Sequence, residues 1–359
     1  MLFLFFTRGW RKLQTFYPGV EKPFTKVSIL IAARNEEEKI HLTIEDILAQ
    51  NYPQDLMELI VVDDHSTDRT SDIILSYADR GVILLKLNED RALNSYKKKA
   101  ISEAIKISAG ELMVATDADC RMGKNWLRTV VSFYEKNNSK LVSSPVAYYE
   151  EKDTFEDMQT LEFLFLIGLG ASSIGNKMPS TCNGANLAYR KDVFFELGGF
   201  SGIDDLASGD DELFLHKVAS RYPDDIGFCK SSGAIVYTHA KHNLRSFISQ
   251  RKRWASKAVK YKDKKIVALG VFMWLTNVFF CLNVLLGFYE PYYWQIAALS
   301  LVFKFIAELT FLIPVTLFAK RSELLVFVPI LSIIHIFYII YIGLVGTTGK
   351  YIWKGRLVR

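Results

Sequence analysis

Cysteine is scarce in this chain of 359 residues, which contains only four, and no two of them form a CxxC pair. Neither a disulfide scaffold nor a zinc module is therefore indicated, and the four residues are typical of separate, reduced thiols in a cytoplasmic compartment. The absence of an internal repeat excludes collagen-like and coiled-coil fibres, and an aromatic content of 13% excludes intrinsic disorder. The net charge of +5 is too small to indicate a nucleic-acid partner.

Hydrophobic residues, in contrast, make up half of the chain, and the long apolar runs are concentrated at its C-terminal end. Residues 266–288 carry no charge over a length that crosses a bilayer core, and residues 324–346 do the same. Between them, residues 293–318 contain Lys304 and Glu308, which would share one helix face and turn toward protein. We expect two to three transmembrane helices within residues 266–346.

Charge predicts the orientation of these helices. Residues 241–265 contain ten Lys or Arg and one Asp, a net charge of +9, so the rest of the chain sums to −4. By the positive-inside rule, a basic interfacial helix at 246–265 and the domain before it face the cytoplasm, as in a multi-pass protein of the cell (inner) membrane. The basic tail at 347–359 disagrees with three spans, so either one apolar segment is re-entrant or the rule fails here.

The first residues, 1–23, form a separate N-terminal segment. Met1 to Phe6 is apolar but too short to cross a membrane, and basic residues follow it, whereas a signal peptide would place them first. The segment is interpreted either as an interfacial anchor or as the remnant of a clipped transmembrane span.

Residues 24–245 alternate short apolar runs with helical patterns, which predicts an α/β domain with a mainly parallel sheet flanked by helices. The expected strands are 27–33, 59–63, 82–87 and 112–117, and the expected helices are 37–50, 68–77 and 97–108. Three of the strands end in polar clusters, at 34–36, 63–66 and 117–119. A lone Asp there is usually a cap or turn residue, but three clusters at one edge indicate a ligand site.

Asp117 and Asp119 could direct two carboxylates at one cation beside a diphosphate. Such hard oxygen ligands suit Mg²⁺ or Mn²⁺. An Asp-x-Asp pair taken alone is common by chance.

Five segments in this order resemble the inverting family 2 glycosyltransferases: VSILIAARNE (27–36), VVDDHSTD (61–68), ATDAD (115–119), GDDE (209–212) and QRKRW (250–254). The last is similar to the Gln-x-x-Arg-Trp box of membrane-bound members, such as cellulose, hyaluronan and poly-N-acetylglucosamine synthases and ceramide glucosyltransferase. The resemblance covers residues 27 to about 265. It implies a GT-A nucleotide-sugar-binding fold that uses a UDP-sugar and a divalent cation, Mg²⁺ or Mn²⁺.

The resemblance also implies roles for individual residues. One of Lys97 to Lys99, for which we take Lys97, would stand on the phosphate side, although a solvated basic helix start is the alternative. Asp117 and Asp119 would hold the metal. The nucleotide-binding set is Ala33, Glu36, Asp63, Lys97 and Asp117.

Inversion at an anomeric carbon needs a carboxylate that takes the proton of the acceptor hydroxyl. The resemblance places this base at the second acid of the GDDE segment, Asp211. Asp210 and Glu212 are the competitors, and both could instead cap the helix that follows.

In the QRKRW segment, Gln250, Arg253 and Trp254 would share one helix face. Arg253, with Arg251 nearby, could bind the departing diphosphate, and Trp254 could stack on an acceptor sugar. A basic, aromatic juxtamembrane helix is the alternative, and the lysines from Lys257 onward are expected in solvent or at lipid headgroups. Asn183 stands in a segment that resembles the acceptor side of the family.

Residues 154–167 mix acidic and apolar side chains, which predicts a helix either on the membrane interface or in the domain core.

The hypothesis is a membrane-anchored enzyme that transfers a sugar from a UDP-sugar to a lipid-linked or glycan acceptor, in contact with membrane lipids and without nucleic acid. A processive polysaccharide synthase is the alternative. A non-catalytic membrane scaffold of the same fold is the rival from another class, and a nucleotidyltransferase is a second enzyme rival.

Overall fold

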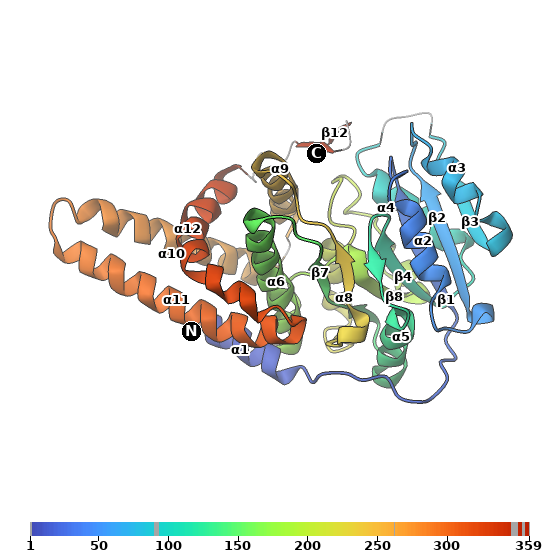
Figure 1. Ribbon diagram of the computed structural model, residues 1–359, viewed down its shortest axis with the longest axis horizontal. Helices are drawn as coiled ribbons and strands as arrows, with labels where there is room; N and C mark the ends of the chain where they lie inside the picture. Colours follow the sequence, from blue (N-terminus) through green and yellow to red (C-terminus); the bar gives the residue numbers. More distant parts are fainter. Residues whose placement is uncertain (1, 90–92, 262, 346–350, 354–355, 359) are drawn as a thin grey trace.

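The computed structural model describes residues 2–89, 93–261, 263–345, 351–353 and 356–358. An α/β domain forms one part of the molecule, and three long helices near the C-terminus extend away from it to one side (Figure 1). The central sheet is mainly parallel and is flanked by helices, so the predicted fold class is confirmed.

The central sheet has seven strands in the order β3-β2-β1-β4-β8-β6-β9. Strands β1 to β4 are parallel to one another, whereas β8 runs antiparallel to both β4 and β6. The strands are β1 (Val27–Ala33), β2 (Met57–Asp63), β3 (Val82–Lys86), β4 (Leu112–Asp117), β6 (Leu141–Ser143), β8 (Leu187–Arg190) and β9 (Ile226–Phe228). A smaller sheet joins β5 (Arg121–Met122), β10 (Val236–Thr238) and β7 (Val146–Tyr148).

The register of the parallel strands brings the polar strand ends to one edge. Ala33 is level with Asp63 on β2, and Ala32 is level with Asp117 on β4. β1 can lie in the middle of the sheet because its sequence, VSILIAA, is apolar toward both faces, as buried parallel strands require.

Alternate residues of β1 enter two different cores. Leu30 packs with residues of α4 (Tyr96–Ile107), whereas Ile29 and Ile31 pack with residues of α2 (Ile40–Leu48) and α5 (Trp126–Asn137). The expected strands and helices of this region are all present, with ends that differ by a few residues. The remaining helices of the domain are α3 (Thr70–Leu75), α7 (Lys191–Glu196) and α8 (Glu212–Arg221), with short 3-10 turns η1 (Gln54–Leu56), η2 (Ala78–Arg80), η3 (Gly184–Asn186) and η4 (Ser232–Ala234).

Four helices of the described residues are long and apolar enough to cross a membrane. Three of them lie over the predicted spans: α10 (Lys264–Leu286), α11 (Tyr292–Ala319) and α12 (Val328–Val345), the last preceded by η6 (Ser322–Phe327). On α11, Lys304 pairs with Glu308, which also accepts a hydrogen bond from Ser332 of α12. That the helices cross a membrane stays a prediction.

The fourth such helix, α6 (Thr154–Gly175), lies mostly inside the molecule, where it contacts α11, β7 and β9. Of the two interpretations of residues 154–167, burial in the core is the one observed. α9 (Leu244–Ala255) and η5 (Ser256–Lys260) connect the α/β domain to α10.

The N-terminal helix α1 (Leu2–Lys12) is packed against α6 and α11. Phe6 and Trp10 are buried in the same core as residues of both helices. Lys230 also donates hydrogen bonds to the carbonyls of Trp10 and Leu13, so the segment is tied to the α/β domain as well.

Beyond α12, the predicted basic tail is described only at β11 (Tyr351–Trp353) and β12 (Arg356–Val358). Lys350, Lys354 and Arg359 of the tail, Lys262 of the basic segment and Met1 lie outside the described residues.

Candidate active site

A cavity of about 620 Å³ opens at the carboxyl ends of β1 and β4. It brings together residues that are distant in the sequence, from the first strand to α12. All the predicted site residues line it except Asp63: Ala33, Glu36, Lys97, Asp117, Asp119, Asn183, Asp210, Asp211, Gln250, Arg251, Arg253 and Trp254.

At the end of β2, Asp64 lines the cavity and Asp63 does not. Asp63 is buried and accepts a hydrogen bond from the backbone N–H of Ser66 at 3.1 Å, so its carboxylate shapes the turn after the strand. Arg34 donates to the carbonyls of Asp64 and His65, which fixes the ends of β1 and β2 to each other.

Lys97 lies between two of the predicted acids. Its Nζ is 2.7 Å from Asp117 Oδ1 and 3.2 Å from Asp210 Oδ2. Burial alone would raise the pKa of Asp117, but the charge and hydrogen bond of Lys97 outweigh it and lower that pKa. In turn, burial alone would lower the pKa of Lys97, but the two carboxylates raise it. The site therefore holds an ammonium group and at least one ionised carboxylate side by side.

The three consecutive lysines have separate partners. Lys98 is buried and donates to the carbonyls of Ile203, Leu206 and Ser208, which fixes the loop that leads to the GDDE segment. Burial lowers the pKa of Lys98 to about 8. Lys99 pairs with Glu103 on the surface of α4, so only Lys97 faces the cavity.

Asp211 is the N-cap residue of α8. It accepts hydrogen bonds from the N–H groups of Glu212 at 2.6 Å and Gly184 at 3.1 Å, and Lys257 Nζ lies 3.4 Å from its Oδ1. Burial alone would raise the pKa of Asp211, but the charges of Lys257 and Lys97 and these two N–H donors lower it to about 2. Asp211 is therefore ionised at neutral pH.

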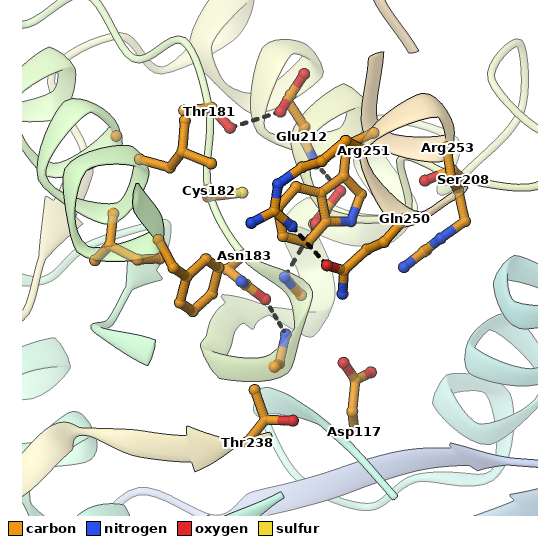
Figure 2. Close-up of a pocket in the computed structure, with 18 of the residues that line it drawn as sticks. Asp117, Thr181, Cys182, Asn183, Ser208, Glu212, Thr238, Gln250, Arg251 and Arg253 are labelled. Atoms are coloured by element: carbon orange, nitrogen blue, oxygen red, sulfur yellow. Dashed lines mark hydrogen bonds between the residues drawn. The ribbon is translucent and has the colours of Figure 1, made fainter. Parts of the chain in front are cut away.

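Glu212, the competitor of Asp211, is buried and already has partners. It accepts hydrogen bonds from Thr181 at 2.6 Å and from Tyr261, and Lys257 is 3.4 Å away (Figure 2). Its contacts join α8 to the segment between η5 and α10, which is a structural role.

The QRKRW segment lies on α9, and its side chains point in different directions. Arg253 directs its guanidinium into the cavity, and Gln250 lies near it (Figure 2). Arg251 is buried and binds Glu162 of α6 with an Nε to Oε1 distance of 3.0 Å. Because Arg251 is engaged with Glu162, Arg253 is the arginine of this segment that is placed for a phosphate.

Aromatic rings form the wall beside α9. The ring centroids of Trp254 and Phe163 are 6.0 Å apart, and Phe163 stacks on Tyr148 with 4.3 Å between the ring centroids. Asn183, on the opposite side, caps η3 by accepting a hydrogen bond from Ala185 N–H. Of these three rings only Trp254 is partly exposed, and the Arg251 guanidinium lies 4.3 Å from its ring centroid.

Among the described residues, no group of three or more His, Cys, Asp and Glu side chains could hold a metal by itself. Asp117 and Asp119 supply two carboxylates beside each other at the cavity. Mg²⁺ is commonly held by one or two carboxylates together with substrate phosphates. The donor set therefore fits a cation that binds jointly with a diphosphate.

Sequence reasoning missed two residues of the site. Lys257 was expected in solvent, but it is buried against Asp211 and Glu212. Glu162 had no assigned role, but it fixes α9 to α6. Glu162 had one sequence signal, a charge within an apolar stretch, which is typical of a buried ion pair, whereas Lys257 lies in the basic segment and had none.

Residues 28–198 match the family model described as glycosyl transferase family 2. These residues belong to that family. The protein is accordingly a glycosyltransferase, an enzyme that acts on a nucleotide sugar, as the resemblance implied.

Two relatives illustrate the range of the family. The probable glycosyltransferase YdaM of Bacillus subtilis (strain 168) is 26% identical over 88% of this chain and 81% of its own length. WfaP of Escherichia coli, a UDP-Glc:α-D-GlcNAc-diphosphoundecaprenol β-1,3-glucosyltransferase, is 36% identical over 35% of this chain and 47% of its own length. The match to this second relative thus covers less than half of the length of WfaP.

Among solved structures, the mannosyltransferase PcManGT of Pyrobaculum calidifontis, in complex with GDP-Man and Mn²⁺, is similar over 92% of this chain and 94% of its own, with a TM-score of 0.53 and 18% identity. The GT-A fold of the enzyme is confirmed by this similarity together with the family match.

Proposed function

We propose that this glycosyltransferase is a membrane-anchored, inverting enzyme that transfers a sugar from a UDP-sugar to a lipid-linked or glycan acceptor. The observation that supports this proposal most is that one cavity contains both the residues proposed to bind the donor phosphates and the carboxylate proposed as the base. The phosphate side has Lys97, Asp117 and Arg253, and the carboxylate is Asp211.

In this proposal, Asp211 accepts the proton of the attacking hydroxyl. Its low pKa keeps it ionised, and the hydroxyl becomes strongly acidic as its oxygen bonds to the anomeric carbon, so a weakly basic carboxylate is sufficient. Gly184 N–H and Lys257 hold the carboxylate in place. Asp210, bound by Lys97, would lie toward the donor phosphates.

Departure of UDP needs positive charge near the diphosphate. Lys97 and Arg253 supply it, with Arg253 able to bind two phosphate oxygens through its planar group. Asp117 and Asp119 would hold Mg²⁺ or Mn²⁺, which neutralises charge on the leaving phosphate. Glu36 and Ala33, with Asp64 in place of Asp63 at the cavity wall, would contact the nucleoside. On the acceptor side, Trp254 would carry a sugar ring, with Asn183 and Gln250 nearby.

Anchoring in the cell membrane, with the catalytic domain in the cytoplasm, is supported by α10–α12 and the basic segment before them. Basic residues of that segment that face solvent would contact anionic lipids. The non-catalytic scaffold is disfavoured because Asp211, Asp117 and Asp119 all line one cavity.

A panel of radiolabelled UDP-sugars and GDP-mannose, offered to the purified protein with a membrane lipid extract, tests the proposal. We expect one UDP-sugar to release UDP and to label a lipid, with activity lost in EDTA and restored by Mn²⁺ or Mg²⁺. Exclusive use of GDP-mannose would contradict the UDP donor, and a long labelled polymer would favour the processive synthase.

A further inference from the structure

The cavity does not end at the reaction centre. It continues past Arg251 and Trp254 into a space between α6, α10 and α12. This second half is lined by apolar side chains, among them Leu166 and Ile167 of α6, Met273 of α10, and Ile339 and Ile342 of α12. The cavity is therefore amphipathic, with charged groups at the strand ends and hydrocarbon at the helices.

The border between the two halves carries no net charge. The Arg251 guanidinium is neutralised by Glu162, and Arg251 also donates to Gln250 at 2.5 Å. His335 and Tyr338 of α12 line the cavity at the same level as Ile339. A bound molecule that crosses this border would pass from polar partners to apolar ones within a few ångström.

The apolar half opens at Gly270 of α10. Gly270 lines the cavity and is exposed, and a Cβ atom added there would meet no other atom within 4 Å. The neighbouring Val271 and Phe272, which do not line the cavity, are 51% and 56% exposed. The opening thus lies on the apolar outer surface of a helix that is long enough to cross a membrane.

We propose that the acceptor is an amphiphile whose hydrocarbon chain enters beside Gly270 and lies between α6, α10 and α12, with its polar end at Asp211. This inference rests on the proposed function, because it names the acceptor class of the same site. A polysaccharide chain fits poorly in this half, since its hydroxyl groups would lose their hydrogen bonds to water among Ile, Leu and Met side chains. A hydrocarbon chain gains free energy there.

Photolabelling with a hexadecyl phosphate that carries a diazirine near the end of its chain tests the inference. The full-length protein is placed in phosphatidylcholine vesicles, and labelled residues are identified by mass spectrometry. We expect saturable labelling of Met273, Ile339 and Ile342 that excess unlabelled hexadecyl phosphate removes. Labelling of Val271 and Phe272, which face the surrounding lipid, should not saturate and serves as an internal reference.

Gly270→Trp fills the opening and should reduce the saturable labelling by about tenfold. A tenfold loss of affinity corresponds to the burial of roughly two fewer methylene groups of the hydrocarbon chain. Val271→Trp, on the outer face, is the matched control and should leave it unchanged. Should the Gly270 variant fail to fold, the wild-type labelling pattern still decides the question.

Four results separate the outcomes. Labelling of the outer face alone would overturn the inference, and removal of the cavity labels by a water-soluble glucan oligosaccharide would assign the apolar half to a polymer. UDP release by the wild-type protein is measured on the same samples. If UDP is released but the cavity is not labelled, the inference fails while the proposed function stands. If no UDP is released from any UDP-sugar, the proposed function fails.

Discussion

At the scale of single residues, two lysines of the candidate site each form ion pairs with two acidic residues. Lys97 holds Asp117 and Asp210, and Lys257 holds Asp211 and Glu212. The adjacent carboxylates of Asp210 and Asp211 therefore have different lysine partners. In the proposed mechanism, this separation would place Asp210 beside the donor and leave Asp211 for the acceptor.

Lys257 is therefore expected to be a positioning residue. In Lys257→Met, the largest of the effects that offset burial is removed while Lys97 and the two N–H donors remain, so the pKa of Asp211 rises from about 2. If Asp211 is the base, activity needs its ionised form and is lost as the pH falls through this pKa, so the acid limb of the pH profile of kcat/KM should move to higher pH.

Lys257→Arg should restore the wild-type profile, and Lys265→Met, which removes an exposed lysine of the same segment, should not shift it. An unchanged acid limb in Lys257→Met would mean that Lys257 does not control Asp211.

At the scale of elements, α9 carries Arg253 and Trp254 at the cavity, and a buried ion pair fixes it to α6. The buried pair Arg251–Glu162 makes this connection, and Arg251 also lies 4.3 Å from the ring centroid of Trp254. Removing one partner of a buried ion pair leaves the other charge buried and typically costs about 3–5 kcal/mol.

Glu162→Leu should therefore lower the melting temperature clearly, whereas the double variant Glu162→Leu/Arg251→Met should recover most of it, because no unpaired charge remains. Differential scanning fluorimetry of the detergent-solubilised protein measures both. Equal melting temperatures for the single and double variants would show that the charge pairing does not fix α9.

The crossing of α1 and α6 is a second element-scale contact. A Cβ atom at Gly9 would lie 2.1 Å from the Ser172 carbonyl oxygen, and one at Gly175 would lie 2.3 Å from the Gly9 carbonyl oxygen. The two backbones thus touch, and Asn176 adds a hydrogen bond to the Phe5 carbonyl at 2.7 Å. Only glycine permits this approach.

Gly9→Ala should separate the helices and destabilise the protein by about 1–3 kcal/mol, as overpacking of a core does. The matched control is Gly19→Ala, where the added Cβ would find its nearest contact at 3.9 Å. The melting temperature compares the two, and a Gly9→Ala protein as stable as the control would contradict the observed crossing.

At the scale of the whole molecule, the sequence predicted the sheet and the meeting of the strand-end acids at one cavity. The reason is local: parallel strands are continuous apolar runs, and the residues that follow them reach one edge, as Asp117 and Asp119 do. The interior place of α6 could not be predicted, because its apolar surface suits a membrane interface and a protein core equally.

The contacts of Lys257 and Glu162 were also beyond sequence reasoning. They join positions 46 and 89 residues apart and exist only once α6, α8 and α9 have packed together. Asp63 was predicted to bind the nucleotide, and this stays a prediction, but the turn after β2 places Asp64 rather than Asp63 at the cavity wall.

Membrane anchoring is a prediction at this scale. Many apolar side chains of α10–α12 are exposed on the outer surface, such as Leu275, Phe303 and Phe337 at 50% or more. We expect the protein to stay in the membrane pellet after washes with high salt and alkaline carbonate, because this surface would be costly in water. Release by either wash would show peripheral attachment.

The central claim is that Asp211 accepts the proton during sugar transfer. Asp211→Asn keeps the shape of the side chain and removes its charge, and sugar transfer from the preferred UDP-sugar should fall by about 10²–10⁴-fold, the usual contribution of general base catalysis. Asp79→Asn, an exposed substitution on η2, is the control and should transfer at the wild-type rate. If Asp211→Asn transfers sugar as fast as the wild-type protein, Asp211 is not the base.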